Sequence, residues 1–186
     1  MTVLGVFGAE SGELLEIARD PEVISARMAG LGAIFERWEA EHDLHRSSSQ
    51  EEILEAYREP VGRLQAKFGF QSADVISVSA DHPQKSELRA KFLSEHIHTD
   101  FEVRFFVEGR GLFYLHPDNH VYALLCERGD LISVPDRLKH WFDLGAEPAL
   151  KCIRLFTTPE GWIAEFTGSD IAERFPRLEA FCEDYA

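Results

Sequence analysis

The segment EHIHTDFEVRFFVEG, which begins at Glu95, concentrates side chains that can hold a metal ion. His96 and His98 are followed by Glu102 and then by Arg104, all at even positions. On an extended strand, residues of one parity point to the same side. The spacing therefore predicts that these four side chains share one face, on the condition that no bulge interrupts the strand between His98 and Glu102.

The odd positions of the same segment are apolar, which predicts a strand that is buried on both faces. They are Ile97, Phe101, Val103, Phe105 and Val107. Two imidazoles, a carboxylate and a guanidinium cannot stay unpaired in such a place, because an unpaired buried charge is strongly destabilising. A divalent metal ion would satisfy the imidazoles and the carboxylate together. The even positions are therefore expected to point into the lumen of a barrel that holds an ion.

His140, in the later segment GDLISVPDRLKHWF, is the best candidate for a fourth ligand. Three neutral imidazoles and one carboxylate suit a first-row transition metal such as iron, nickel, cobalt or zinc, and they disfavour calcium and magnesium. An octahedral ion with four protein ligands keeps two positions for a bidentate oxygen ligand.

The elements that must position these residues change character along the chain. The N-terminal third reads mainly helical, with a capping box at Ser48/Glu51 or Ser49/Glu52 and a stop at Gly69. A proline at 60 should kink or divide its helix. Expected helices cover about 21–32, 49–68 and 84–94, and expected strands cover 33–38 and 74–80.

From Glu95 to about Phe166, short apolar runs alternate with turn signals, which favours a sandwich or barrel over a βαβ sheet. The tail returns to helix. We expect a mainly β fold in one domain, 1–186. Helices and strands of about 1–90 would pack on a barrel of about 91–167, followed by a helix over about 168–184.

Composition excludes several classes of function. The chain has 186 residues, a formal charge of −14 and a pI near 4.9, which argues against nucleic acid and anionic membranes as partners. Three widely spaced cysteines form no CxxC pair, which indicates reduced thiols. The first residues do not read as a signal peptide, and no apolar run approaches the ~20 residues of a membrane span. We expect a soluble, cytoplasmic protein.

Two segments together resemble the cupin motifs. His96-x-His98-x3-Glu102-x6-Gly109 is similar to the first motif, and the Gly129, Pro135 and His140 spacing is similar to the second. The chain departs from the usual cupin pattern at three positions, without loss of a ligand: Ala90 and Arg137 replace glycines, and Leu144 replaces an asparagine.

A closer resemblance is to the acireductone dioxygenase family. It covers most of the chain, including EHIHTDFEVRFFVEGRGLFYLH, LCERGDLISVPDRLKHWFDLG and IRLFTTPEGWIAEFTG. It implies a cupin double-stranded β-helix, a jelly-roll barrel with flanking helices. The implied metal is one Fe²⁺ or Ni²⁺ per chain, held by His96, His98, Glu102 and His140.

The same resemblance implies a reaction. The O2-dependent cleavage of 1,2-dihydroxy-3-keto-5-methylthiopentene in methionine salvage would give formate and 4-methylthio-2-oxobutanoate with iron. With nickel it would give 3-methylthiopropanoate, formate and carbon monoxide. The expected partners are only this small molecule and O2, and the protein is expected to be a monomer.

Roles for other residues follow from the resemblance. Arg104 would promote formation of the substrate dianion, and Arg154 would contact its enediolate oxygens. Glu95 is associated with metal incorporation and Phe101 with relaying conformational change. The expected pocket wall around the methylthio tail consists of Phe92, Phe142 and Trp162. An acidic protein that binds an anion needs such cations in its lumen, and a guanidinium can pair with adjacent oxygens.

Two other functions stay open on the sequence alone. One is a different small-molecule cupin dioxygenase, of the thiol or quercetinase type, with the same ligands and another pocket. The other is a non-catalytic cupin that binds a metabolite for sensing, although no effector domain is visible. His82, His116 and His120 lie near turns and are expected at the surface.

Overall fold

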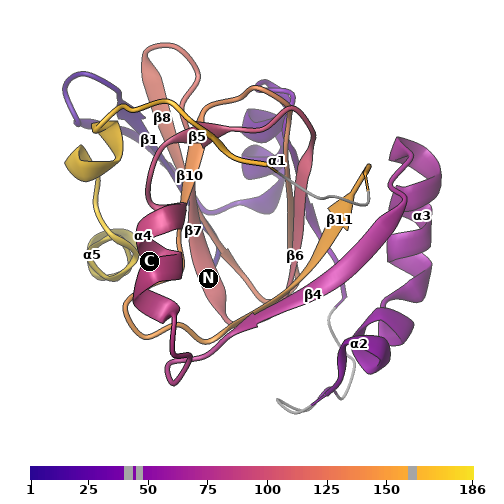
Figure 1. Cartoon of the computed structure of the whole chain (residues 1–186). Helices are drawn as coiled ribbons and strands as arrows, with labels where there is room; N and C mark the ends of the chain where they lie inside the picture. The colour runs from indigo at the N-terminus through magenta and orange to yellow at the C-terminus, as the bar shows by residue number, and fades with distance from the viewer. Residues whose placement is uncertain (40–43, 45–47, 159–162) are drawn as a thin grey trace.

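Two antiparallel β-sheets face each other in the computed structural model, which describes residues 1–39, 44, 48–158 and 163–186 (Figure 1). One sheet has seven strands in the order β12-β5-β10-β7-β8-β1-β2, and the other has five in the order β3-β9-β6-β11-β4. The predicted mainly β fold with flanking helices is therefore confirmed.

Each sheet draws on strands that are far apart in the sequence. The larger sheet contains β1 (Val3–Gly8), β2 (Leu14–Ala18), β5 (His96–Ile97), β7 (Arg110–Leu115), β8 (His120–Glu127), β10 (His140–Asp143) and β12 (Glu165–Phe166). The smaller contains β3 (Ile34–Arg37), β4 (Ser72–Val78), β6 (Glu102–Glu108), β9 (Asp130–Val134) and β11 (Leu150–Phe156).

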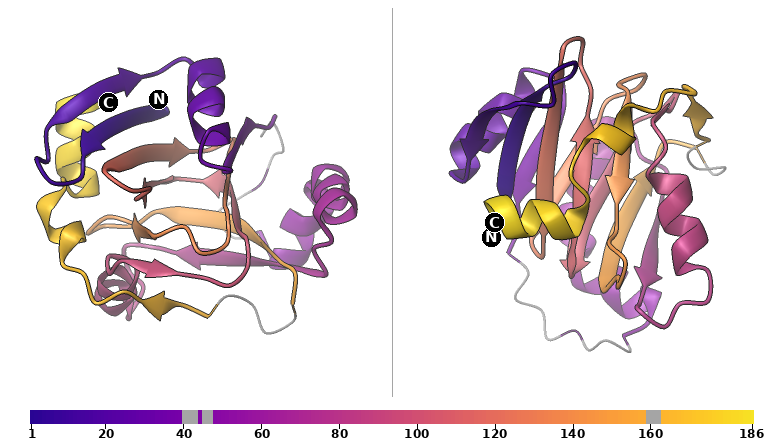
Figure 2. Two further views of the ribbon diagram at one scale, coloured as in Figure 1. Left: turned by 90° about the horizontal axis from the view of Figure 1, so that it is seen from above. Right: turned by 90° about the vertical axis from the view of Figure 1, so that its left-hand side faces the viewer.

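The helices lie outside the sheets. They are α1 (Pro21–Ala29), α2 (Gln50–Ala56), α3 (Arg58–Phe68), α4 (Lys85–Phe92) and α5 (Leu178–Tyr185), with a short 3₁₀ helix η1 (Ile171–Arg174) before the last. In Figure 1, α2 and α3 lie on the side opposite to α4 and α5. Figure 2 shows the two ends of the chain close together beside α5.

Local signals set several helix ends as predicted. Asp20 caps α1 by accepting a hydrogen bond from the Glu22 backbone, and the Ser49–Glu52 capping box opens α2. The predicted division of the next helix occurs at Tyr57, so that the proline at 60 falls in the first turn of α3, where its missing N–H costs no helical hydrogen bond. Gly69, with φ of 76°, ends α3.

The expectation of a mainly helical N-terminal third is wrong for residues 3–18. They form the hairpin β1–β2, and β1 pairs with β8 from Val3 opposite Leu125 to Gly8 opposite His120. β3 and β4 also belong to the sheets, so β structure begins well before residue 91, where we expected the barrel to start. This segment forms strands because it pairs with a distant strand, and no local sequence pattern encodes that pairing.

Apolar side chains fill the space between the sheets and also both outer sides. The lumen cluster includes Phe106, Phe113, Leu124 and Ile132. A second cluster lies under α5, and a third lies beneath α2 and α3. Strands of both sheets are therefore buried on both faces, and a polar group in the lumen has to find its partners inside the protein. Within the described ranges no helix is long and apolar enough to cross a membrane.

Candidate metal centre

The four predicted ligands converge, but the first three, His96, His98 and Glu102, do not come from one continuous strand. β5 ends at Ile97 and β6 begins at Glu102, and these strands belong to different sheets. The prediction of a single strand from His96 to Arg104 is therefore wrong, because the chain crosses from one sheet to the other between them. The rule that even-numbered residues share one face applies only within β6, where the even positions face the lumen.

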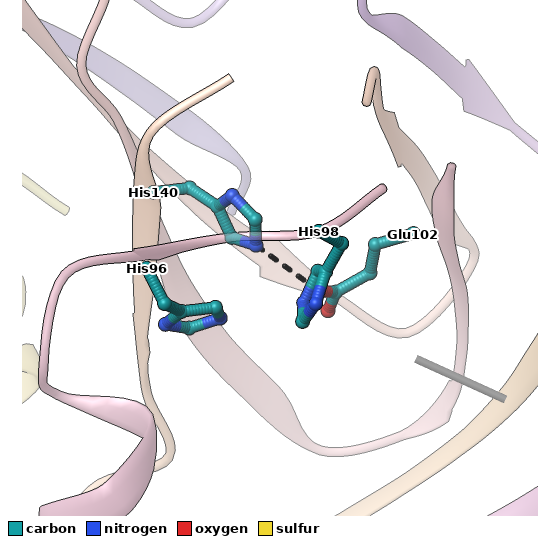
Figure 3. A group of neighbouring side chains, drawn as sticks. All are labelled: His96, His98, Glu102 and His140. Carbon is teal, nitrogen blue, oxygen red and sulfur yellow. Dashed lines mark hydrogen bonds and ion pairs between the residues drawn. The ribbon is translucent and has the colours of Figure 1, made fainter. Parts of the chain in front are cut away.

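The ligand atoms of His96, His98, Glu102 and His140 all lie within 4.8 Å of one another, and all four residues are buried. Nε2 of His98 lies 3.0 Å from Oε2 of Glu102, and Nε2 of His140 lies 3.2 Å from the same oxygen. The rings of His96 and His140 are 4.4 Å apart between centroids. Figure 3 shows the three imidazoles close together, with the Glu102 carboxylate beside the rings of His98 and His140.

Backbone carbonyls orient all three imidazoles. Nδ1 lies 2.7 Å from the Ser94 oxygen in His96, 3.0 Å from the Ile163 oxygen in His98, and 2.6 Å from the Leu138 oxygen in His140. A carbonyl only accepts, so each Nδ1 carries the hydrogen and each neutral ring presents its lone pair at Nε2.

This donor set fits a transition-metal ion. In the neutral form, the Nε2 atoms and Glu102 Oε2 are all acceptors within 4.8 Å of one another, an arrangement that a shared cation stabilises. The backbone bonds at Nδ1 are the outer contacts that metal-bound histidines commonly make. Imidazole nitrogens with a carboxylate oxygen match iron, nickel, cobalt or zinc.

The electrostatics differ from one ligand to the next. Burial lowers the pKa of His96 to about 4, and the nearby His140 acts in the same direction. Burial also acts to lower the pKa of His98, but its hydrogen bond and ion pair with Glu102 outweigh burial and raise that pKa. Burial acts to raise the pKa of Glu102, yet the charge of Arg104 and the two imidazoles hold it well below its usual range.

Arg104 is held between the metal ligands and an aromatic wall. Its Nε donates to Oε1 of Glu102 at 2.7 Å, so that the other carboxylate oxygen faces the imidazoles. Its guanidinium carbon lies 4.7 Å from the ring centroid of Phe142 and 5.5 Å from those of Phe92 and Phe113. Such cation–π contacts stabilise a desolvated guanidinium.

The ring of Phe142 depends on a glycine in the neighbouring strand. A Cβ at Gly111 would lie only 2.3 Å from Cζ of Phe142. A larger residue at 111 would therefore displace this ring from its place over Arg104.

A cavity of about 140 Å³ opens beside the ligands. The predicted residues Phe92, Phe142 and Arg154 lie on its wall. Trp162 lies outside the described residues. Sequence reasoning missed three wall residues: Lys91, a further cation beside the site, and Ala164 and Phe166, whose types carry no chemical signal.

Glu95 is buried, with 2% of its surface exposed, and it binds two residues that sequence reasoning did not connect to it. Its carboxylate accepts from Nδ1 of His116 at 2.6 Å and from the hydroxyl of Thr167 at 2.7 Å. The expectation that His116 is a surface residue is wrong, because its ring turns inward from the end of β7. The predicted relay residue Phe101 is half-buried and packs against the cluster beneath α2 and α3.

Arg137 adopts the left-handed conformation at the position where the cupin pattern has glycine, with φ of 59°. Its backbone N–H donates to the His98 carbonyl at 2.8 Å. The turn that precedes His140 is therefore tied to the segment that carries His98, in spite of the substitution.

Comparisons with known proteins agree with this geometry. A family model described as the ARD/ARD' family matches residues 9–164. The chain is 61% identical over 186 residues to the acireductone dioxygenase of Methylococcus capsulatus, with both chains fully covered. It is 58% identical over 170 residues to that of Aquifex aeolicus, covering 91% of this chain and 93% of the relative.

A solved structure, an acireductone dioxygenase from Bacillus anthracis with a cadmium ion in its active centre, superposes with a TM-score of 0.75. It is 31% identical and the match covers 87% of this chain and 97% of that one. The predicted cupin fold is confirmed with it. By sequence and by fold, the chain belongs to the ARD/ARD' family, the family of the acireductone dioxygenases.

Proposed function

We propose that this chain is a metal-dependent acireductone dioxygenase of methionine salvage, which cleaves 1,2-dihydroxy-3-keto-5-methylthiopentene with O2. The observation that carries this proposal is the buried His96, His98, Glu102 and His140 group, with Arg104 beside it on the wall of the adjoining cavity. Identity of 61% to an acireductone dioxygenase over the whole chain supports the choice of substrate.

The four ligand residues would hold one Fe²⁺ or Ni²⁺. When bound, the ion supplies a Lewis acid that anchors two adjacent substrate oxygens. The cadmium ion in the Bacillus anthracis enzyme supports a divalent cation at this place. The Nδ1 hydrogen bonds of the three histidines keep their Nε2 atoms directed at the metal position. The ligands therefore need little rearrangement when an ion binds.

Arg104 would stabilise the dianionic form of the substrate. Arg104 as a whole residue is only 4% exposed, and a buried positive charge acts more strongly on a nearby anion than it would in water. Glu102 and the three aromatic rings fix its orientation before substrate arrives. The rings of Phe92 and Phe142 would contact the methylthio tail and exclude water from the reacting carbons.

The reaction products would depend on the metal. With iron we expect formate and 4-methylthio-2-oxobutanoate, and with nickel 3-methylthiopropanoate, formate and carbon monoxide. The chain's own residues are identical in both forms, so a difference in products would arise from how the substrate oxygens are chelated.

The test is anaerobic reconstitution of metal-free protein with each ion, followed by addition of acireductone and O2. We expect O2 consumption with either metal, and carbon monoxide only with nickel. Failure to consume O2 with every metal would overturn the proposed function. Identical products from both metals would overturn only the metal dependence of the outcome.

We further propose that the protein works as a cytoplasmic monomer whose partners are the small-molecule substrate and O2. Its three cysteines are free, and Cys126 and Cys152 are buried, which suits a reducing compartment. The charge of −14 disfavours nucleic acid and anionic lipid. Sedimentation of the metal-loaded protein at micromolar concentration tests the oligomeric state.

A further inference from the structure

Three charged side chains lie in one row across the five-stranded sheet. Arg104 on β6 is directly opposite Arg154 on β11, and Arg154 is directly opposite Asp74 on β4. Directly opposed residues of antiparallel strands point to the same face of the sheet. Two guanidiniums are therefore neighbours on the lumen side, and a carboxylate follows at the outer end of the row.

The row ends in a two-point ion pair. Nε of Arg154 donates to Oδ1 of Asp74 at 2.8 Å, and Nη2 donates to Oδ2 at 2.6 Å. The guanidinium carbon also lies 5.2 Å from the ring centroid of Phe156. Two parallel hydrogen bonds fix both the position and the plane of a guanidinium. Arg154 is thus held by Asp74 as Arg104 is held by Glu102.

The pair lies nearer the solvent than Arg104 does. Arg154 lines the cavity, and its side chain is 26% exposed while that of Asp74 is 36% exposed. The inner cation, Arg104, is only 5% exposed. The cavity therefore has one deep guanidinium beside the metal ligands and one nearer the solvent.

Two effects act against a fixed position for the Arg154 guanidinium. Like charges on directly opposed residues of neighbouring strands repel each other. A long arginine side chain also has many rotamers, and Arg154 is exposed enough to reach solvent. Asp74 opposes both effects, because it attracts the guanidinium toward β4 and restricts its rotation.

We propose that Asp74 is a positioning residue for substrate binding, which acts by holding Arg154 in the cavity wall. This inference rests on the proposed function, and it specifies how that site would recognise an anion. Substrate would meet two oriented cations, the inner one kept in place by a metal ligand and the outer one by Asp74. Asp74 itself touches no reacting atom.

The predicted effect is on binding and not on the chemical step. Loss of the Asp74 carboxylate leaves the four ligands and Arg104 unchanged, so metal content and kcat should be kept. Arg154 would sample other rotamers, and substrate would have to order it on binding. A partly exposed pair contributes little to stability, so the variant should fold.

The experiment compares Asp74→Asn with Asp81→Asn in the metal-loaded protein. Asp81 is exposed in the turn after β4 and gives the same change of net charge. We expect Asp74→Asn to raise KM for acireductone by about five- to tenfold, roughly 1 kcal/mol, with kcat within about twofold. Asp81→Asn should leave both constants unchanged.

A double-mutant cycle separates the pair from general effects. Arg154→Lys should also raise KM, and adding Asp74→Asn to it should change KM by less than about twofold. An unchanged KM in Asp74→Asn, an equal effect of Asp81→Asn, or additive effects in the cycle would overturn the inference. Wild-type protein that consumes no O2 with acireductone would instead contradict the proposed function, on which the inference depends.

Discussion

At the scale of single residues, similar side chains in one site have unlike charge states. Burial and His140 depress the pKa of His96 to about 4, whereas Glu102 raises that of His98 above its usual value. In the metal-free site at neutral pH, His96 is therefore a neutral imidazole, whereas His98, beside the ionised carboxylate of Glu102, holds its proton more tightly than a free imidazole does.

Metal binding should release that proton. The His98 proton is present below its raised pKa and absent above it, and a metal ligand must be deprotonated. We expect protons to be released on binding near pH 6.5, and fewer as pH rises to 8.5. Calorimetric titration of metal-free protein with Zn²⁺, in two buffers of different ionisation enthalpy at each pH, measures the number. Heats that are independent of the buffer at both pH values would contradict this assignment.

Arg104 should be required for turnover and dispensable for metal retention. In Arg104→Lys, the positive charge is kept but the planar donor that contacts Glu102 is lost. We expect kcat/KM to fall about 10²-fold with metal content unchanged, because electrostatic stabilisation in a buried site depends on orientation. Elemental analysis and O2 uptake provide the two measurements. Arg110→Lys, at an exposed arginine, is the matched control, and a decrease of less than threefold in Arg104→Lys would refute the role.

At the scale of elements, His116 links the segments that carry two ligands. Its backbone N–H donates to the carbonyl of Lys139, which precedes His140, and its ring binds Glu95, which precedes His96. β7 is thus connected through one residue to β10 and to β5. This residue stands at the end of a strand beside a turn, a position that by pattern alone suggests solvent.

Removal of this link should weaken metal binding without unfolding the protein. We expect His116→Ala to lower Zn²⁺ affinity by about tenfold, because the buried Glu95, which precedes the ligand His96, loses the ring that it binds, while the backbone bond to Lys139 stays. Competition with a chromophoric chelator gives the dissociation constant. His120→Ala, at an exposed histidine on β8, serves as control. Equal affinities in wild type and His116→Ala would show that the bridge does not position the ligands.

Local patterns predicted elements better than they predicted connections. The capping box, the division of the second helix and the strand runs after Glu95 depend on residues that are neighbours in the sequence, and the sequence predicted them. The crossover between His98 and Glu102 was not, because an alternating pattern looks the same whether the strand continues or changes sheet. Asp74, His116 and Thr167 act through partners distant in sequence, which no spacing reveals.

At the scale of the whole molecule, the site joins the two sheets. His96 and His140 belong to the seven-stranded sheet, whereas Glu102 belongs to the five-stranded one. A bound ion would cross-link them. The ligand residues were nevertheless predictable from the sequence. Several polar side chains in an apolar segment require a common partner whether the strand continues or the chain crosses to the other sheet.

Removal of the metal should therefore lower thermal stability. An ion present at a thousand times its dissociation constant adds about 4 kcal/mol, which for a chain of this length corresponds to roughly 10 °C in Tm. Thermal unfolding followed by circular dichroism, with and without excess chelator, measures the shift. His140→Ala should lose most of this sensitivity. A wild-type Tm that does not respond to chelator would mean that the ion does not cross-link the sheets.

Because Gly111 lies so close to the Phe142 ring, the size of the residue at position 111 limits the size of the residue at position 142 on the neighbouring strand. A lineage that gained a side chain at 111 would have to accept a smaller residue at 142, and the chamber beside Arg104 would widen as a result. A chamber for a bulkier substrate tail would thus require replacements at both positions, and the residue at 111 would not itself contact the substrate.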